Sequence, residues 1–429
     1  MNIFKLTYLS LKNLFRNSRR TLITVLVSSS GFAALAIVSG YMDFTFYGLK
    51  ELTICKGFTS GGGNGHIELF NKDYALKEEH YPLEYGISEY QTLQSCIETD
   101  KNVIATIPRI EFNGLISNGD KSISFLGTGI EPKKEIMLIK YWNNLSAVTN
   151  KDKIVNTPIE KLYNNSDNSV LLGEEMAKVL DAKPGSDLML MSTTVDGAVN
   201  VVDVTVAGIS KNPMKSIDRY YLVTNLKTAQ NLLQTDKISK IVLVLNSTDK
   251  TNSEIPLIAN IINRKYNQSL FTILPWHKNA EYYQSIRDAY NIIFSFTGII
   301  VVVIVFLSCT NTMLMATMER VREIGVMKAI GISNSWITLM FLIEGFFIGL
   351  FSIVFGMVLK YIFSSIINNI GFNMPPPPGM SMTYILQIFS ASQYLPWISI
   401  LVIISTTFSG LISVRRIKNI SIVSSLTHV

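Results

Sequence analysis

Acidic residues are confined almost entirely to one stretch of this chain. Of its 32 Asp and Glu residues, all but Asp43, Glu319, Glu323 and Glu344 lie between residues 46 and 290. Only 16% of all residues are charged, whereas a soluble protein carries about a quarter. The stretch from 46 to 290 therefore has the composition of a water-soluble domain, and the remainder has the composition of a membrane protein.

Four apolar runs lie outside the charged stretch. A helix that crosses the hydrocarbon core of a bilayer needs about 20 apolar residues. The runs predict membrane helices over 21–45 (with the start of a stalk), 287–315, 335–363 and 394–414. The first run is expected to stay as an anchor, because it is too long for a signal peptide and lacks a clear cleavage site. The predicted fold is an α-helical membrane protein with four transmembrane helices and a large mixed α/β domain, residues 46–286, between the first two.

Lys and Arg residues beside the apolar runs predict the orientation. They cluster in segments 1–20, 316–334 and 415–429, and the loop 364–393 has none. Because cytoplasmic loops carry the excess of basic residues, both termini and the 316–334 loop are predicted to be cytoplasmic. The 46–286 domain and the 364–393 loop then lie outside. The net charge of +6 comes from these clusters, so it does not indicate nucleic acid as a partner.

The N-terminal segment predicts a helix of another kind. Phe4, Leu11 and Phe15 recur on one helical face and are flanked by basic residues. This pattern predicts a basic amphipathic helix on the inner membrane surface, interacting with lipid. The alternative is a plain cytoplasmic extension of the first membrane helix.

The outer domain reads as mixed α and β, with enough length for a core of its own and for two subdomains. Segments 109–117 and 121–129 alternate in polarity around Asn118-Gly119-Asp120, which predicts a β-hairpin. Further strands are predicted over 103–107, 188–192, 201–208 and 240–246, and helices over 173–180, 228–233 and 254–266.

No catalytic constellation is visible in this domain. His66, His80 and His277 lack partners at a metal-ligand spacing. The run 61–65, Gly-Gly-Gly-Asn-Gly, lacks the Lys and Ser/Thr of a phosphate-binding loop and is predicted to be a flexible joint. The sequence therefore predicts a chain that is not an enzyme and has no catalytic, cofactor-binding or metal-binding residues.

Three cysteines and one intramembrane acid also stand out. Cys309 lies in an apolar run and is interpreted as a small buried hydrophobe. Cys55 and Cys96 are a candidate disulfide if the domain is periplasmic, but the sequence does not give their separation. Glu344 lies inside the third apolar run, and either a structural role or a partner contact fits it. Small residues in the first and third runs suit close helix packing, either within the chain or in a dimer; they include Gly31, Gly40, Gly345, Gly349 and Gly356.

The most informative part of the predicted cytoplasmic loop is the segment Glu319-Arg320-Val321-Arg322-Glu323-Ile324-Gly325-Val326-Met327-Lys328-Ala329-Ile330-Gly331. It is helix-forming up to its final glycine. It predicts a short amphipathic helix that exposes Ile324, Met327 and its charged residues and inserts into a groove on a partner. The alternative is a solvated loop whose charges only set the topology.

This loop resembles the E-R-x-R-E-I-G-x-x-K-A-I-G signature of FtsX-type ABC transporter permeases, the type VII group that contains MacB, LolC and LolE. Other features also resemble this family. They are the segment 9–21, the predicted order of helices, and the motifs Gly65-His66-Ile67-Glu68 and Met374-Pro375-Pro376-Pro377-Pro378-Gly379. Two departures stand out. Unlike MacB, the chain is expected to have no ATPase fused ahead of its first helix, and the tail from Arg415 to Leu426 lacks the usual Pro and Glu.

The resemblance implies a permease subunit in the bacterial inner membrane that works by mechanotransmission. Two copies of a separate cytoplasmic ATPase would bind ATP and Mg²⁺, and this chain would hold no cofactor. A dimer with a second permease chain, identical or different, would couple hydrolysis to motion of MacB-like periplasmic domains. By the same resemblance, the ATPase-coupling residues are Glu319, Arg320, Arg322, Glu323, Ile324, Gly325, Met327 and Lys328.

The resemblance leaves the substrate open. Release or transport of lipoproteins is the first expectation, because a separate ATPase and four helices are the format of LolC and LolE. One alternative is MacB-like tripartite export of a peptide, toxin or drug. Another is an FtsX-like regulator of periplasmic hydrolases, although the outer domain of FtsX is much smaller. A membrane-anchored sensor without an ATPase is a fourth reading, against which the coupling-like loop argues.

Overall fold

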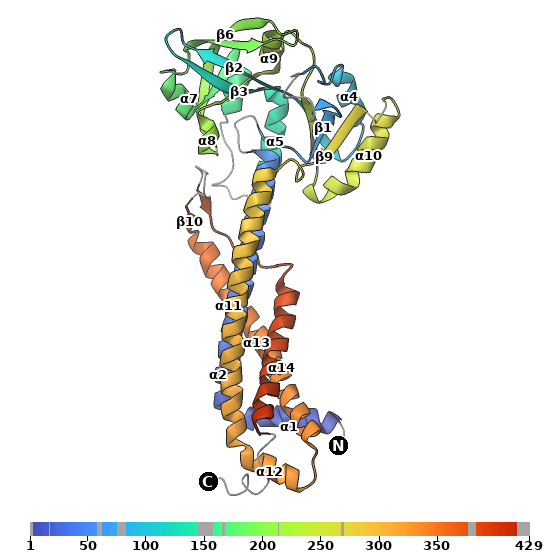
Figure 1. The fold of residues 1–429 in the computed structure, drawn as a ribbon, viewed down its shortest axis with the longest axis vertical. Coiled ribbons are helices and arrows are strands. Elements are labelled where there is room, and N and C mark those ends of the chain that lie inside the picture. Colours follow the sequence, from blue (N-terminus) through green and yellow to red (C-terminus); the bar gives the residue numbers. More distant parts are fainter. Residues whose placement is uncertain are drawn as a thin grey trace. The chain divides into compact units, whose positions relative to one another are not determined.

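The computed structural model describes residues 3–16, 18–57, 62–74, 83–144, 158–164, 168–212, 214–266, 270–375 and 383–417. The chain divides into two compact units. The membrane unit comprises Met1–Tyr47, Arg287–Asn373 and Ile385–Val429, and the α/β unit comprises Gly48–Ile286 and Met374–Tyr384. Figure 1 shows the elements of both units.

Within the residues that the structure describes, four helices are long and apolar enough to cross a membrane, as predicted. They are α2 (Ser18–Cys55), α11 (Glu281–Glu319), α13 (Asn334–Ile370) and α14 (Leu395–Ile417). The 38 residues of α2 correspond to about 57 Å of helix, well beyond the hydrocarbon thickness of about 30 Å. The helix therefore continues past the predicted crossing, and its residues from Gly48 onward belong to the α/β unit.

Small residues let the membrane helices approach one another within the chain. A Cβ atom added at Gly345 of α13 would lie 2.6 Å from the backbone oxygen of Thr406 on α14. At Gly356 it would lie 2.6 Å from Phe32 on α2, and at Gly31 only 2.1 Å from Val305 on α11. These glycines therefore serve helix packing inside the chain.

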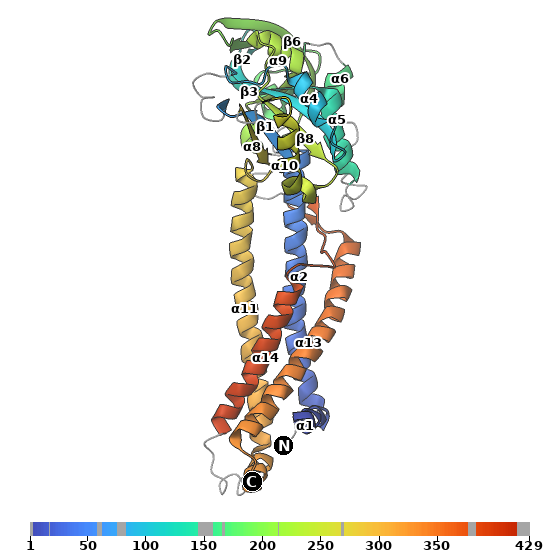
Figure 2. The ribbon, with the colours of Figure 1, turned by 90° about the vertical axis from the view of Figure 1, so that its right-hand side faces the viewer.

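The N-terminal helix α1 (Ile3–Arg16) is separate from α2 and lies crosswise to it (Figures 1 and 2). Its residues Leu6, Ser10 and Leu14 are buried, and the helix packs on α13. Tyr8 and Phe15 are 65% and 70% exposed. The helix thus has one face packed on α13 and another face, with Tyr8 and Phe15, that is open. The side chains of Phe4 and Lys5 lie outside the described residues.

The α/β unit contains a nine-stranded sheet in the order β3-β7-β4-β6-β5-β2-β8-β1-β9. Because β3 also pairs with β2, strands β2 to β7 close into a ring, from which β8, β1 and β9 extend. The strands are β1 (Ile67–Asn71), β2 (Val103–Ser117), β3 (Ser122–Ile130), β4 (Ser169–Gly173), β5 (Asp187–Thr193), β6 (Val199–Ser210), β7 (Tyr221–Asn225), β8 (Lys240–Leu245) and β9 (Phe271–Pro275). A separate pair is formed by β10 (Asn373–Met374) and β11 (Tyr384–Ile385).

Strand β2 joins the two parts of this sheet. Its first half pairs with β8, from Val103 to Arg109, and its second half pairs with β3 in the predicted hairpin. The hairpin is confirmed, with Ser117 opposite Ser122 and Gly119 at φ +96° in the turn, a conformation that favours glycine.

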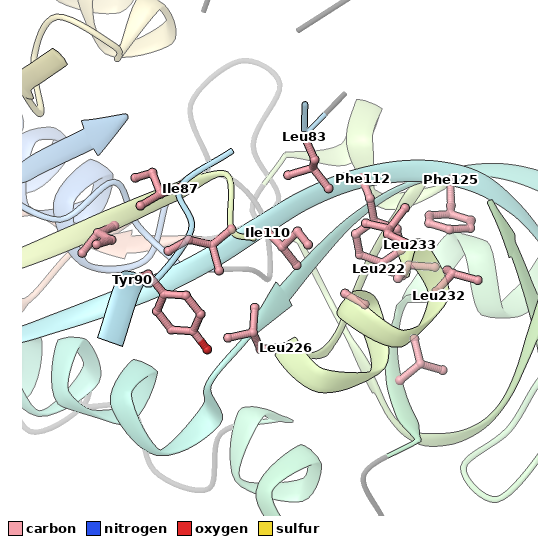
Figure 3. Packing of buried hydrophobic residues seen from close by; sticks show 14 of the residues in the cluster. Leu83, Ile87, Tyr90, Ile110, Phe112, Phe125, Leu222, Leu226, Leu232 and Leu233 are labelled. Atoms are coloured by element: carbon pink, nitrogen blue, oxygen red, sulfur yellow. The ribbon is translucent and has the colours of Figure 1, made fainter. Parts of the chain in front are cut away.

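Helices cover the sheet and complete its core. The helix α9 (Leu226–Leu233) buries one face that includes Leu226, Leu232 and Leu233, and these side chains meet Phe112 and Phe125 from the hairpin (Figure 3). The other described helices of the unit are α4 (Tyr90–Ile97), α5 (Pro132–Asn144), α6 (Pro158–Asn164), α7 (Glu174–Val179), α8 (Lys215–Asp218), the short 3₁₀ helix η1 (Thr248–Lys250) and α10 (Thr251–Asn263).

Buried charges link strands and a helix of this unit. Arg109 on β2 donates to both carboxylate oxygens of Glu135 on α5, at 2.6 and 3.0 Å. Burial works against the charged guanidinium, but the adjacent Glu135 carboxylate outweighs it and raises the pKa of Arg109. Lys240 lies 3.0 Å from Glu68 and 2.6 Å from Glu111. Burial opposes the ammonium there too, yet the two carboxylates raise the pKa of Lys240.

The glycine run predicted as a flexible joint is closely packed in its described part. A Cβ atom at Gly63 would lie 2.1 Å from the backbone oxygen of Ile54. At Gly62, with φ at +92°, it would lie 2.6 Å from Arg109 and Glu135. The glycines are therefore needed for the close approach of neighbouring atoms rather than for backbone flexibility. Gly61 lies outside the described residues.

Candidate functional site

The loop between α11 and α13 contains a short helix, α12 (Val321–Ala329). Arg320 is its N-cap residue, and Gly331 follows its end at φ +90°. Glycine at that position allows the left-handed turn that ends a helix. The chain then enters α13 at Asn334, so α12 is held at both ends by membrane helices.

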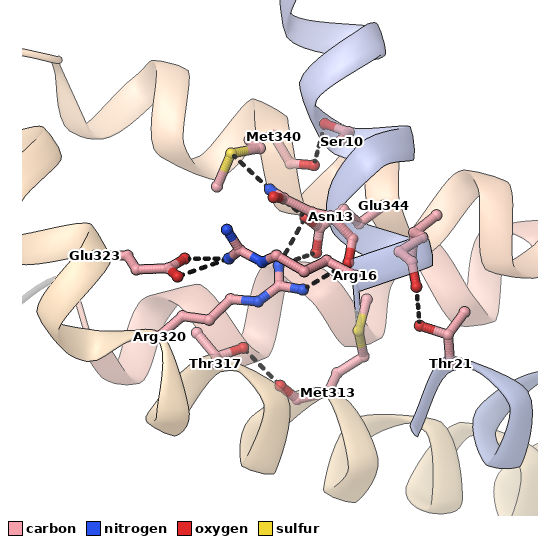
Figure 4. A network of polar contacts seen from close by, with 11 residues as sticks. Ser10, Asn13, Arg16, Thr21, Met313, Thr317, Arg320, Glu323, Met340 and Glu344 are labelled. Carbon is pink, nitrogen blue, oxygen red and sulfur yellow. Dashed lines mark hydrogen bonds and ion pairs between the residues drawn. The ribbon is translucent and has the colours of Figure 1, made fainter. Parts of the chain in front are cut away.

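A buried ion pair anchors the start of α12 to α13. Arg320 Nη1 donates to Glu344 Oε1 and Oε2 at 2.9 and 3.1 Å, and the two residues are 6% and 3% exposed (Figure 4). Asn13 of α1 donates to Glu344 Oε1 at 3.2 Å, and its backbone oxygen accepts from Arg320 Nη2 at 3.2 Å. One carboxylate therefore ties together α1, α13 and the start of α12.

A second, exposed set of ion pairs surrounds this anchor. Arg16 Nη2 of α1 donates to both carboxylate oxygens of Glu323 on α12, at 2.6 and 2.7 Å. Arg20 of α2 pairs with Glu319 at the end of α11. Because these pairs are about half exposed, water weakens them, and each contributes on the order of 1 kcal/mol or less.

The inner face of α12 is apolar and corrects one prediction. Ile324 was predicted to be exposed, but it is 3% exposed and packs with Val321 in a cluster that includes Leu6 of α1 and Phe341 of α13. Gly325 is buried as well. The reason is tertiary: α1 and α13 cover the face of α12 that carries Val321 and Ile324.

The outward face of α12 is a different stripe. Arg322 and Glu323 are exposed there, Val326 is 43% exposed, and Ile330 at the end of the helix is 76% exposed. Met327 and Lys328 are half-buried. We call Arg322, Glu323, Val326 and Ile330 the outward face of α12. It combines charge with exposed apolar surface, as a docking helix does.

The remaining predicted site residues lie elsewhere. Cys55 and Cys96 are both free, so the structure contains no disulfide between them. Cys55 is buried in an apolar cluster with Trp276 and Tyr283, and Cys96 lies on α4. Cys309 is buried among apolar side chains, as interpreted from the sequence.

No group of three or more His, Cys, Asp or Glu residues within the described ranges is arranged to hold a metal ion. His80, His428, most of the proline run after Met374, and the tail from Lys418 lie outside those ranges.

The chain is similar in sequence to known proteins. Residues 295–422 match the family described as FtsX-like permease C-terminal. The chain is 22% identical over 279 residues to the lipoprotein-releasing system transmembrane protein LolC of Neisseria meningitidis, covering 63% of each chain. It is 47% identical over 73 residues to the ABC transporter permease YtrF of Bacillus subtilis, covering 17% of each. These matches span less than two thirds of either relative's length.

Among solved structures, the periplasmic region of MacB from Actinobacillus actinomycetemcomitans is similar with a TM-score of 0.34 and 12% identity. The match covers 49% of this chain and 89% of that one.

Four described helices long and apolar enough to cross a membrane, together with these sequence matches, make the chain similar to ABC transporter permeases. More particularly, the chain carries an FtsX-like permease domain over residues 295–422, which includes α12, α13 and α14, and LolC and YtrF are its homologues.

Proposed function

We propose that this chain is the permease subunit of an ABC transporter in a bacterial inner membrane. A separate cytoplasmic ATPase, in two copies, binds ATP and Mg²⁺ and docks on the outward face of α12. The α/β unit, inserted between the first and second membrane helices, lies on the periplasmic side. Both termini and the α12 loop are cytoplasmic, and a second permease chain completes the complex.

The observation that carries this proposal is the construction of α12. Its outward face is open, with Ile330 76% exposed, while its base is held by the buried pair Arg320–Glu344. A loop that served only as a connection would need neither a buried charge pair nor an exposed apolar residue, because both are unfavourable in isolation.

The anchor also suggests how force passes from the ATPase. Movement of α12 displaces Arg320, which is bonded to Glu344 and to the backbone of Asn13. Displacement is therefore shared by α13 and α1 instead of bending the loop alone. This arrangement suits a permease that moves helices and the domains attached to them, without a substrate path through the helices.

Lipoprotein release is the substrate class we propose. It rests on the match to LolC, which is described as part of a lipoprotein-releasing system and covers 63% of this chain. MacB-like export and FtsX-like regulation predict different partners. Copurification of an outer-membrane channel or adaptor would favour export, and copurification of a cell-wall hydrolase would favour regulation.

The test is affinity purification of the full chain in mild detergent, followed by mass spectrometry. The wild-type chain should retain an ABC ATPase in near-equal amount. Val326→Asp and Ile330→Asp should each lose at least about tenfold of it, because a buried, unpaired carboxylate is strongly unfavourable in an interface. Leu126→Asp is the matched control, since Leu126 is 54% exposed on β3 of the α/β unit. Equal recovery of the ATPase with all variants would contradict docking on α12.

A further inference from the structure

The motif Gly65-His66-Ile67-Glu68 has no part in docking the ATPase, yet it is completely buried at the start of β1. Gly65 has φ +63°, and a Cβ atom there would lie 2.3 Å from Val242 on β8. His66 and Glu68 are both 0% exposed. Buried polar side chains need specific partners, and those of His66 lead to the end of α2.

The hydrogen bonds of His66 define its proton position. The backbone N–H of Leu245 donates to Nδ1 at 3.0 Å. The proton of the neutral ring is therefore on Nε2, which lies 3.2 Å from Thr248 Oγ1. The ring of Tyr141 packs edge-on against the imidazole, with centroids 5.0 Å apart.

Thr248 is the centre of this chain of hydrogen bonds. Its hydroxyl accepts from His66 Nε2 and lies 3.2 Å from the hydroxyl of Tyr141. It donates to Glu51 Oε1 at 2.9 Å. A threonine hydroxyl has one proton and two acceptor lone pairs. All three bonds are satisfied together when Tyr141 donates as well, so the direction of the chain runs from His66 to Glu51.

Glu51 lies near the C-terminal end of α2 and is 2% exposed. Its Oε2 has no hydrogen-bond partner within the described part of the chain, and Lys50 Nζ lies 3.7 Å from Oε1. An apolar residue at this position would pack at lower cost if packing were the only requirement. The carboxylate is therefore best explained by its bond to Thr248.

The backbone at the end of α2 is held on a second side. The carbonyl oxygens of Thr53 and Ile54 accept from the N–H groups of Asn64 and Gly65, each at 2.9 Å. These carbonyls have no partner inside the helix, so the segment that enters β1 caps α2. The backbone caps and the Glu51 side chain together restrain both translation and rotation of the last turns.

We propose that Glu51, Thr248 and His66 form a lock that fixes the end of α2 to strands β1 and β8 of the α/β unit. These three are positioning residues. Because they hold α2 on the sheet, a displacement of α2 moves the sheet instead of bending the chain at residue 55. The consequence for transport rests on the proposed coupling function, whereas the lock itself does not.

Cys55 gives a direct measure of the lock. It is 2% exposed, packs with Leu49 and Trp276, and is free. A buried thiol reacts only when its surroundings open. In the full chain, labelling of Cys55 by a maleimide, followed by peptide mass spectrometry, should be at least about tenfold faster in Thr248→Val, because three polar groups lose their shared partner. Thr248→Ser keeps the hydroxyl and should label at the wild-type rate.

Thr224→Val is the matched control. Thr224 is 0% exposed, and its hydroxyl donates to the backbone oxygen of Ser169 at 2.8 Å, away from α2. If Thr224→Val accelerates labelling of Cys55 as much as Thr248→Val does, the thiol reports general loosening of the unit and the lock is refuted. Labelling of Cys55 in Thr248→Val at the wild-type rate also refutes the lock.

The coupling role is tested in the complex purified with its ATPase. Hydrogen exchange of β1 and β8 should change between the nucleotide-free and ATP-bound wild-type complexes. Thr248→Val should still retain the ATPase but lose this change. If Thr248→Val labels rapidly at Cys55 but keeps the nucleotide-dependent change in hydrogen exchange, the role of the lock in coupling is overturned. If the wild-type chain retains no ATPase, or if nucleotide does not change hydrogen exchange in its complex, the proposed function is overturned as well. The labelling of Cys55 still decides whether the lock exists.

Discussion

Glu344 accepts hydrogen bonds from Arg320 and from Asn13, which are 24 and 331 residues away in the sequence. The carboxylate is 3% exposed, so its charge is balanced by protein groups rather than by water. Removing one member of such a pair leaves the other charge buried, whereas removing both often has little cost. This asymmetry separates the structural role of the pair from its role in coupling.

Glu344→Leu alone is expected to destabilise the membrane unit by about 3–5 kcal/mol, because Arg320 remains buried without its carboxylate. The double variant Arg320→Met with Glu344→Leu should recover most of the stability. Thermal unfolding of the full chain in detergent measures both. We expect the double variant to bind the ATPase but to stimulate it poorly, because α12 is then held by apolar contacts alone. Normal stimulation by the double variant would show that the pair is only structural.

Glu323 pairs with Arg16 of α1, and in the proposed complex it also faces the ATPase. Glu323→Lys should abolish stimulation of the ATPase and leave membrane insertion intact. Exchanging the charges, with Arg16→Glu and Glu323→Arg, restores the pair with α1 but not the charge presented to the ATPase. We expect the exchanged variant to remain uncoupled, with stability within about 1 kcal/mol of wild type. Recovery of stimulation on exchange would assign Glu323 to holding α1.

The sequence predicted the parts of the fold whose signal lies in one continuous segment. Membrane helices are found from summed hydropathy over about 20 residues, and the hairpin from alternation around Asn118-Gly119-Asp120. Strands β1, β4, β7 and β9 were missed. Each has only five residues, and in β4 all five are buried, so no alternation marks it.

The arrangement of the candidate site could be predicted only in part, for a related reason. The loop residues and Glu344 were each recognised, but their pairing depends on how α12 folds back on α13. Val326 and Ile330 share a spacing of four, as do residues on any helical face. Which stripe is covered is decided by α1 and α13, and so Ile324 was assigned to the wrong side. The contribution of Asn13, on a helix more than 300 residues away, has no local signal at all.

The pair Arg109–Glu135 offers a test of the α/β unit. Both side chains are almost completely buried, at 4% and 1% exposure. Glu135→Gln keeps the shape but leaves the guanidinium without a counter-charge, so we expect a loss of about 3–5 kcal/mol. Glu174→Gln on α7 is the control, because that side chain is 42% exposed in its pair with Lys178 and should change stability by less than about 1 kcal/mol. Thermal unfolding followed by tryptophan fluorescence distinguishes them, and equal effects would contradict the prediction.

The buried His66 predicts a dependence of stability on pH. Burial, with a smaller effect of Lys50, lowers the pKa of His66 from 6.5 to about 3. Between these values the unfolded chain binds a proton that the folded chain does not, so the free energy of unfolding falls as pH falls below 6.5. The slope approaches about 1.36 kcal/mol per pH unit.

His66→Gln removes the titration and retains an amide that donates to Thr248. Between pH 6.5 and pH 5, the wild type should therefore lose about 1.6 kcal/mol more of its free energy of unfolding than His66→Gln does. Thermal unfolding of both full-length proteins at matched pH values measures this difference, and the carboxylates common to both cancel. A difference that stays constant over this range would show that His66 binds protons equally in the folded and unfolded states, and would contradict the role of Nδ1 as acceptor from the N–H of Leu245.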